Sequence, residues 1–271
     1  LHDAVGERIA EMAEVEAAMV TSGATAAMVL STAGCMTMGD QEKIEQLPTT
    51  DGLKSEVIIQ KNHRYTYDRA LTVAGATLVE VANEQELLAA ISDKTAMMFW
   101  LLANHNPDGD SIPMDRYLAI AGEHNIPTYL DGATMTPPAS NVIDACNLGF
   151  DLVGFSGGKG LRGPYSAGLL LGRKDLVHYA RINGSPYSRA LGRGMKVAPE
   201  EYLGMMVAFE TALSINEDED FARKRVVFSR MSDQMNDVPT LKQNVIVDEG
   251  MVSELYLDLE WDQAVIKMTN E

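Results

Sequence analysis

A lysine in a glycine-rich segment is the first candidate for chemistry in this sequence. The segment FSGGKGLRGP, residues 155–164, lies between two expected strands and carries Lys159. Its small neighbours leave the amine open to a cleft, where a deprotonated lysine can form a Schiff base with a carbonyl. The alternative is a phosphate-binding or merely solvated loop lysine. The segment is not a P-loop, because the GxxxxGK[ST] spacing is missing.

Two further polar residues follow apolar runs that are expected to be strands. Asp131 ends the run 127–130 at the carboxyl edge of the expected sheet, where open α/β sheets bind ligands. A carboxylate at that edge can hold a protonated heterocyclic nitrogen. Asn104 follows the run 96–103 at the same kind of edge. The simpler interpretations are a turn-capping aspartate before a glycine and a plain Asn-Pro turn.

A phosphate site and a ring-stacking site are also possible. Ser22, Gly23, Ala24 and Thr25 lead directly into an expected helix, whose free N–H groups and dipole favour an anion. An ordinary Ser/Thr N-cap would produce the same pattern. His63 follows another expected strand and could stack on a flat cofactor or move protons near neutral pH. A surface loop of mixed charge is the alternative.

These candidates make most sense as a set. The chain contains, in order, a phosphate cradle, a ring-stacking residue, a carboxylate and a lysine. Pyridoxal 5'-phosphate (PLP) requires a lysine for its aldehyde, a carboxylate for its pyridine nitrogen and a helix N-terminus for its phosphate. Cys35 and Cys146 have no second cysteine or histidine at metal-ligand spacing. We therefore expect PLP as the cofactor, no metal and two reduced thiols.

The scaffold that must position these groups is indicated by alternating apolar and helical patterns between residues 20 and 172. Strands alternating with helices are typical of an α/β domain with a mostly parallel sheet. We expect strands at 57–60, 77–81, 96–102, 128–130, 152–155 and 167–171. We expect helices at 24–32, 67–74, 84–91, 114–123 and 142–147.

The alternation of expected strands and helices ends after residue 197. A helical pattern runs from 198 to 236, is broken by the acidic stretch 216–220, and is followed by expected strands at 243–247 and 254–259. We therefore expect a PLP-binding domain over 1–197. Residues 198–271 are expected to form a helical connection and the start of a small α+β domain that ends abruptly.

Composition excludes several other classes of protein. The 271 residues include 39 acidic and 22 basic side chains, a net charge of −17, which argues against a broad nucleic-acid surface. The hydrophobic share of 46% is enough for a large core. The longest apolar run, 96–103, is too short to cross a membrane, and no leader is recognisable at the start. We expect a cytoplasmic protein.

Two segments resemble a known enzyme branch. SGGKGLRGPYSAGLLLGRKDLV, residues 156–177, and EVIIQKNHRYTYDRALTVAGATLVEV, residues 56–81, closely resemble the selenocysteine-synthase-like branch of the fold-type-I PLP enzymes, in the aspartate aminotransferase superfamily. That branch includes L-seryl-tRNA(Sec) selenium transferase and D-glucosaminate-6-phosphate ammonia-lyase. The resemblance covers about residues 1–259. It implies a central, mostly parallel seven-stranded sheet between helices, a small α+β C-terminal domain, and a homodimer or larger oligomer.

The resemblance also implies roles for individual residues. Lys159 matches the Schiff-base lysine and Asp131 the pyridinium partner. His63 is the best candidate for the ring-stacking position, with Arg64 or Tyr65 as alternatives. The remaining expected cofactor contacts are Ser22, Gly23, Ala24, Thr25 and Ser156 around the phosphate and Asn104 near the ring oxygen.

A basic segment near residue 190 resembles a region on the substrate side. Arg189, Arg193 and Lys196 could hold a carboxylate or a phosphate, or could belong to a solvated loop. In family members an additional segment precedes what is here Leu1 and a longer C-terminal domain follows, so we expect a truncated chain. Nothing matches the tRNA-binding region of selenocysteine synthase.

The resemblance implies a PLP-dependent lyase. We expect it to eliminate ammonia or water from a hydroxylated amino acid or amino-sugar acid, with Lys159, Asp131 and His63 as catalytic residues. A selenium or sulfur transferase, another fold-type-I reaction such as transamination or aldol cleavage, and a non-catalytic homologue remain alternatives, because a fold does not determine a reaction. A small-molecule substrate is expected, with no membrane and no nucleic acid as partner.

Overall fold

The computed structural model describes residues 1–103, 109–248, 250–252 and 254–267. The chain divides into two compact units, Leu1–Leu213 and Ser214–Glu271. The helix α8 (Pro199–Leu213) belongs to the first unit, where it contacts α1 (His2–Ala13). The predicted division after residue 197 instead assigned this helix to the second region. In the described part of the chain, no helix has the length and apolar character needed to cross a membrane.

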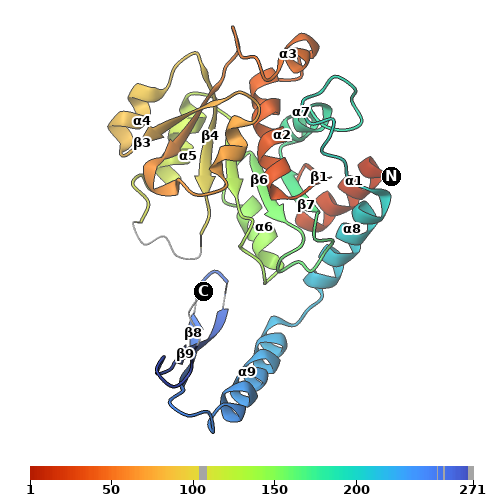
Figure 1. The fold of residues 1–271 in the computed structure, drawn as a ribbon. Helices are drawn as coiled ribbons and strands as arrows, with labels where there is room; N and C mark the ends of the chain where they lie inside the picture. The colour runs from red at the N-terminus through yellow and green to blue at the C-terminus, as the bar shows by residue number, and fades with distance from the viewer. Residues whose placement is uncertain (104–108, 249, 253, 268–271) are drawn as a thin grey trace. The chain divides into compact units, whose positions relative to one another are not determined.

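A seven-stranded sheet forms the centre of the first unit (Figure 1). Strand β7 runs antiparallel to both of its neighbours, and the other neighbouring pairs are parallel. The expected α/β class with a mostly parallel seven-stranded sheet is therefore confirmed. The strand order is β1 (Ala17–Thr21), β7 (Gly168–Gly172), β6 (Leu152–Ser156), β5 (Thr128–Asp131), β4 (Thr95–Leu101), β2 (Glu56–Gln60) and β3 (Thr77–Val81).

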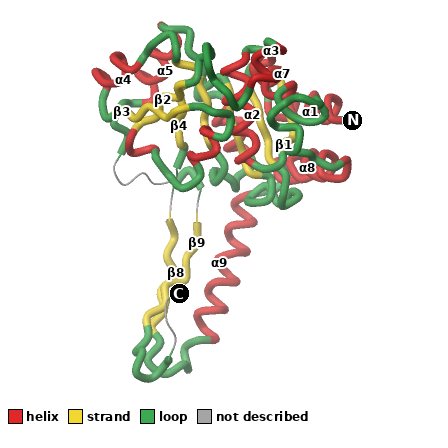
Figure 2. The backbone as a smooth tube through the Cα atoms, turned by 45° about the horizontal axis from the view of Figure 1, so that its top comes forward, coloured by secondary structure: helices red, strands yellow, loops and turns green. Residues whose placement is uncertain are grey.

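Helices cover both faces of this sheet (Figure 2). Successive side chains of a strand point to opposite faces. Phe99 of β4 belongs to a buried cluster shared with α2 (Ala24–Thr37) and α7 (Lys174–Ile182). Trp100, the next residue, instead packs against Tyr117 of α5 (Met114–Glu123), with ring centroids 5.3 Å apart. The near-continuous apolar run of β4 is thus explained by burial on both faces.

Several short elements complete the first unit, and some differ from the expected pattern. The expected helix at 67–74 is a 3₁₀ turn, η2 (Asp68–Thr72). The strand β1, the helices α1 and α7 and the short helix at 41–46 were not predicted. The other short elements are α3 (Gln41–Gln46), η1 (Lys61–His63), α4 (Glu84–Ala90) and α6 (Ser140–Cys146).

The second unit consists of one helix and one hairpin. In it, α9 (Glu217–Gln234) contacts both β8 (Lys242–Asp248) and β9 (Glu254–Glu260), which pair antiparallel (Figures 1 and 2). The helical pattern is interrupted as expected, but at residues 214–216, and the acidic stretch 216–220 forms the start of α9. The Asn216 side chain accepts a hydrogen bond from the N–H of Glu219 at 3.2 Å and caps α9. Acidic residues in a first turn are favoured by the helix dipole.

Candidate active site

A cavity of about 430 Å³ lies at the carboxyl ends of the parallel strands. Its walls come from the residues that end or follow β1, β2, β4, β5 and β6, the edge where open α/β sheets bind ligands. The volume is in the range of small-molecule and cofactor sites. The cavity is lined by Gly23, Ala24, Thr25, Met28, Tyr65, Tyr67, Leu101, Leu102, Ala103, Asp131, Ala133, Thr134, Ser156, Gly158, Lys159 and Tyr165.

One wall of the cavity is the N-terminus of α2. Gly23 caps the helix with a φ of 86°, a left-handed value that favours glycine. The first helical hydrogen bond runs from Ala27 N–H to the Gly23 carbonyl at 3.2 Å, so the preceding N–H groups have no partner within the helix. Gly168 of β7 packs directly behind this turn, since a Cβ there would lie 2.5 Å from the Gly23 carbonyl carbon. The turn is suited to bind an anion such as a phosphate.

Asp131 ends β5 and is only 2% exposed. Its Oδ1 accepts a hydrogen bond from Ala133 N–H at 3.0 Å, and its Oδ2 accepts one from the Tyr65 hydroxyl. Burial raises the pKa of the Asp131 carboxyl above its ordinary value, while the Tyr65 hydroxyl, the Ala133 N–H and the charge of Lys159 each act to lower it. A cation placed against this carboxyl would favour its ionised form.

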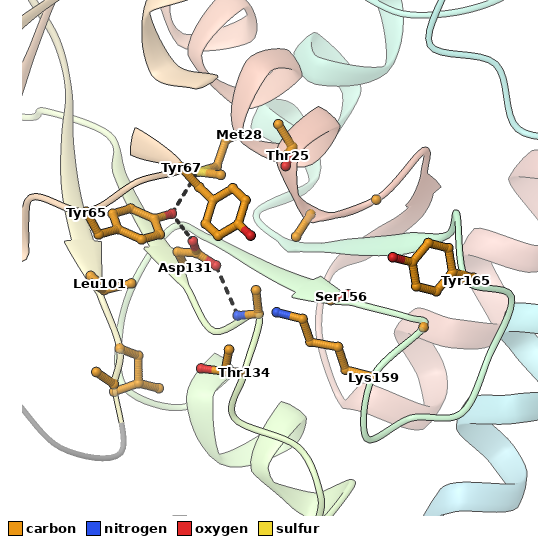
Figure 3. Close-up of a pocket in the computed structure, with 16 residues that line it drawn as sticks. Thr25, Met28, Tyr65, Tyr67, Leu101, Asp131, Thr134, Ser156, Lys159 and Tyr165 are labelled. Carbon is orange, nitrogen blue, oxygen red and sulfur yellow. Dashed lines mark hydrogen bonds between the residues drawn. The ribbon is translucent and has the colours of Figure 1, made fainter. Parts of the chain in front are cut away.

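Lys159 lies in the loop between β6 and β7 and extends its amine toward Asp131 (Figure 3). The loop is closed by backbone hydrogen bonds from Gly157 N–H to the Ala167 carbonyl and from Gly163 N–H to the Gly157 carbonyl, both 2.8 Å long. Ser156, the last residue of β6, lines the same cavity. The lysine amine is therefore presented to the cavity from a hydrogen-bonded loop.

Three tyrosines that were not among the main predicted site residues also line the cavity. Tyr65 lies beside Asp131, and the exposed rings of Tyr67 and Tyr165 lie at other points of the wall (Figure 3). Burial and the nearby Asp131 raise the pKa of the Tyr65 hydroxyl, which keeps it protonated and able to donate. Tyr65 was named only as an alternative to His63, and no sequence signal distinguishes these two neighbours.

His63, the residue expected to stack on the cofactor ring and to take part in catalysis, is not among the described residues that line the cavity. The ring is fully buried and packs edge-on against Trp100, with centroids 4.5 Å apart. Leu101 N–H donates to Nδ1 at 3.3 Å, which leaves the ring proton on Nε2 to donate to Asp110 Oδ1 at 2.9 Å. The turn η1 after β2 thus places the ring against Trp100 of β4, where both ring nitrogens are hydrogen-bonded within the protein.

The expected substrate-binding residues also lie elsewhere. None of Arg189, Arg193 and Lys196, all within the described chain, lines the cavity. Arg189 forms an ion pair with Glu45 of α3, Arg193 Nη1 donates to Ser185 Oγ at 3.4 Å, and Lys196 is exposed. This segment folds back on the end of α7, with Gly192 N–H donating to the Asn183 carbonyl at 2.9 Å. Arg189 and Arg193 thus make polar contacts within this chain.

Ser22 and Asn104, two other residues expected to contact the cofactor, are not found in the cavity wall as described. Ser22 precedes the N-cap of α2 and is not among the described residues that line the cavity. Asn104 lies outside the described residues. The structure brings together Gly23, Ala24, Thr25, Asp131, Ser156 and Lys159.

The groups in the cavity fit PLP. A buried carboxyl group is costly to ionise without a cation, and a protonated pyridine nitrogen would supply one. The N–H groups that begin α2 suit the phosphate, and the lysine amine of the β6–β7 loop suits the aldehyde. The carboxyl, the helix N-terminus and the lysine amine come from three separate elements that line one cavity. PLP carries a basic nitrogen, an acidic phosphate and a carbonyl group, so it can contact all three.

Comparison with known proteins agrees with this fit. Residues 1–177 match the sequence model of the family described as Cys/Met metabolism PLP-dependent enzymes. A solved structure of D-glucosaminate-6-phosphate ammonia-lyase superposes with a TM-score of 0.82 at 20% identity, covering 98% of this chain and 71% of that chain. The solved neighbours are fold-type-I PLP enzymes, as the sequence predicted.

Characterised relatives have several activities. A 5'-C-glycyluridine monooxygenase-decarboxylase from Streptomyces sp is 28% identical over 92% of this chain and 63% of its own length. The D-glucosaminate-6-phosphate ammonia lyase of Salmonella typhimurium is 26% identical over 78% and 57%. An L-seryl-tRNA(Sec) selenium transferase from Aquifex aeolicus is 26% identical over 65% and 44%. The chain thus spans between 44% and 63% of the length of these relatives.

Proposed function

The chain belongs to the Cys/Met metabolism PLP-dependent enzyme family, and on that premise we propose that it is a lyase. Its proposed reaction eliminates ammonia or water from a hydroxylated amino acid or an amino-sugar acid. The observation that carries this proposal is the convergence of Lys159, Asp131 and the N-terminus of α2 on one cavity. The choice of a lyase is supported by the relationship to D-glucosaminate-6-phosphate ammonia lyase.

Each part of the cavity has a proposed task in holding the cofactor. Lys159 would hold the aldehyde end of the cofactor, and the buried Asp131 carboxylate would hold its pyridine nitrogen. The backbone N–H groups of the segment 23–25 bind the phosphate, with the Thr25 and Ser156 hydroxyls at the same wall. Bound PLP supplies an electron sink that stabilises negative charge on a substrate carbon.

The chain's own groups then handle protons and orientation. Once the substrate amine has displaced it from the cofactor, the Lys159 amine would remove the proton from the substrate α-carbon and act as general base. Ionised Asp131 would hold the cationic end of the cofactor ring. Departure of a β-hydroxyl as water, followed by hydrolysis that restores the water, converts a β-hydroxy α-amino acid to a keto acid and ammonia. Atoms and charge balance without an oxidant.

A second candidate is an oxidative decarboxylation. It is favoured by the relative with the widest match among those described above, a monooxygenase-decarboxylase that aligns with 92% of this chain. This reaction would consume dioxygen and release carbon dioxide, whereas the lyase would consume no oxygen. The two proposals can therefore be separated by oxygen uptake.

The test combines cofactor trapping with product analysis. Wild-type protein with added PLP is expected to show a visible band that borohydride removes, and peptide mass analysis should find the cofactor on Lys159. Lys159→Ala should lose the band, whereas Lys54→Ala, a change of an exposed lysine outside this cavity, should keep it. Amino-sugar acids and hydroxylated amino acids are then screened for ammonia and keto acid.

Two outcomes would contradict the proposal. Cofactor trapped on another lysine would remove Lys159 from its role. Carbon dioxide release with oxygen uptake, and no anaerobic ammonia release, would favour the oxidative decarboxylation.

A further inference from the structure

The contact between Tyr65 and Asp131 is not used by the reaction proposed above. Tyr65 follows β2 and Asp131 ends β5, so two distant parts of the chain meet at the cavity. The Tyr65 hydroxyl donates to Asp131 Oδ2, while Ala133 N–H donates to Oδ1 at 3.0 Å (Figure 3). Each carboxylate oxygen thus has one protein donor and retains capacity for another.

The ring of Tyr65 is fixed by its surroundings. It stacks on Phe99 with centroids 6.3 Å apart and an interplanar angle of 18°, and Phe99 stacks in turn on Tyr129 at 5.9 Å and 13°. The backbone is anchored as well, because Tyr65 N–H donates to the buried Asp68 carboxylate at 3.1 Å. A hydroxyl held in this way meets the carboxylate without a further loss of side-chain freedom.

We propose that Tyr65 is a positioning residue that orients the Asp131 carboxylate and favours its ionised form for the pyridine nitrogen of PLP. This inference rests on the proposed function, because it takes Asp131 as the partner of that nitrogen. The physical reason is the opposition between burial and hydrogen bonding. Burial at 2% exposure disfavours the charged carboxylate, whereas donors to its oxygens favour the charge.

Two phenylalanine variants give a matched test. Tyr65→Phe keeps the ring that stacks on Phe99 and removes the hydroxyl, which donates to Asp131 and also lies 3.3 Å from Met28 Sδ. Tyr67→Phe is the control, because Tyr67 lines the same cavity and its ring lies 6.0 Å from that of Tyr65. The described residues include no hydrogen bond between the Tyr67 hydroxyl and Asp131. Thermal unfolding of both variants shows whether the fold is kept.

The measurement follows the pyridine nitrogen itself. Each protein is loaded with PLP labelled with ¹⁵N at the ring, and the ¹⁵N chemical shift is recorded against pH, together with the PLP dissociation constant. Wild type and Tyr67→Phe are expected to keep the nitrogen protonated to higher pH than Tyr65→Phe. Loss of one hydrogen bond to a charged group should weaken PLP binding by roughly tenfold in Tyr65→Phe.

Asp131→Asn separates the two ways in which this idea could fail. If Asp131→Asn lowers the pH at which the nitrogen loses its proton and Tyr65→Phe behaves like Tyr67→Phe, the positioning role of Tyr65 is wrong and the proposed site stands. If Asp131→Asn also leaves the nitrogen shift unchanged, Asp131 is not the partner of the pyridine nitrogen. The proposed site assignment then fails, and the inference about Tyr65 fails with it.

Discussion

Asp131 is proposed to hold the protonated pyridine nitrogen of PLP, and it can do so because it combines a negative charge with a buried position. Asp131→Asn keeps the size of the side chain and its contact with Ala133 but removes the negative charge that would hold a pyridinium. We expect kcat to fall roughly 100-fold or more at saturating PLP, the scale of a lost electrostatic contact in an active site. Turnover of the identified substrate is the measurement, and a borohydride-trapped cofactor shows that the variant is still loaded. Full activity in the loaded variant would be incompatible with the proposed role.

His63 provides a prediction about pH and stability. Burial lowers the pKa of its imidazole below the ordinary 6.5, although Asp110 acts in the opposite direction. The unfolded chain therefore binds a proton at a higher pH than the native protein does. The contribution of neutral His63 is fully present above about pH 6.5 and is lost as the pH falls toward the lowered native pKa.

The measurement is the urea midpoint of wild type and His63→Phe at two pH values on either side of this window. Phenylalanine retains a ring against Trp100 but cannot titrate. We expect His63→Phe to lose less stability on acidification than wild type, even though it is less stable at neutral pH. Equal losses in the two proteins would show that His63 does not titrate in this way.

For individual residues, the sequence predicts which kinds of side chain the site contains better than it predicts which neighbouring residue faces the cavity. Lys159, Asp131 and the segment 23–25 could be proposed because each follows a recognisable strand or begins a helix, and such boundaries point to one sheet edge. His63 and Tyr65 are separated by a single residue, and the 3₁₀ turn η1 decides which of them faces the cavity. A turn of three residues leaves no periodic signal, so the sequence gives no basis for choosing between them.

Among the secondary-structure elements, α2 and β7 depend on each other through Gly168. A Cβ at Gly168 would lie 2.7 Å from the Ala24 nitrogen, a backbone atom at the start of α2. We expect Gly168→Ala to push the N-terminus of α2 away from β7, to cost about 1–3 kcal/mol of stability, and to weaken PLP binding. Chemical unfolding and a PLP titration measure the two effects.

Gly122 of α5 offers a matched control for this substitution. Nothing lies within 4 Å of a Cβ built there, and the residue is helical. Gly122→Ala should therefore leave PLP binding unchanged and stabilise the protein by about 0.4–1 kcal/mol. If Gly168→Ala behaved in the same way, close packing behind the phosphate turn would not be required.

The strands of the sheet differ in how well local sequence patterns predict them. β4 and β6 are strongly apolar and were predicted within a residue or two, because both of their faces are buried. β1 was missed, since Ala17 and Ala18 have little preference for strands and the helix α1 comes shortly before. Its place in the sheet comes from pairing with β7, a long-range contact that no local pattern contains.

At the scale of the whole molecule, the two units differ greatly in how many of their side chains are buried. Among the described residues of the second unit, only Asp220 and Val252 are buried, whereas the first unit contains the entire central sheet and its aromatic core. Local stability follows buried apolar contact. All of the described residues that line the candidate cavity belong to the first unit. The binding of PLP should therefore stabilise one unit and not the other.

Hydrogen exchange measured by mass spectrometry tests this expectation on the 271-residue chain. Amides of α9, β8 and β9 should exchange at least about tenfold faster than those of β4, β5 and β6, because their protecting structure opens at lower cost. Addition of PLP should slow exchange in the first unit, above all at the start of α2 and the end of β5, since a ligand bound to the native state stabilises it by mass action. Exchange in α9 and the hairpin should not change. Protection of α9 by PLP would instead mean that residues of the second unit contribute to the cofactor site.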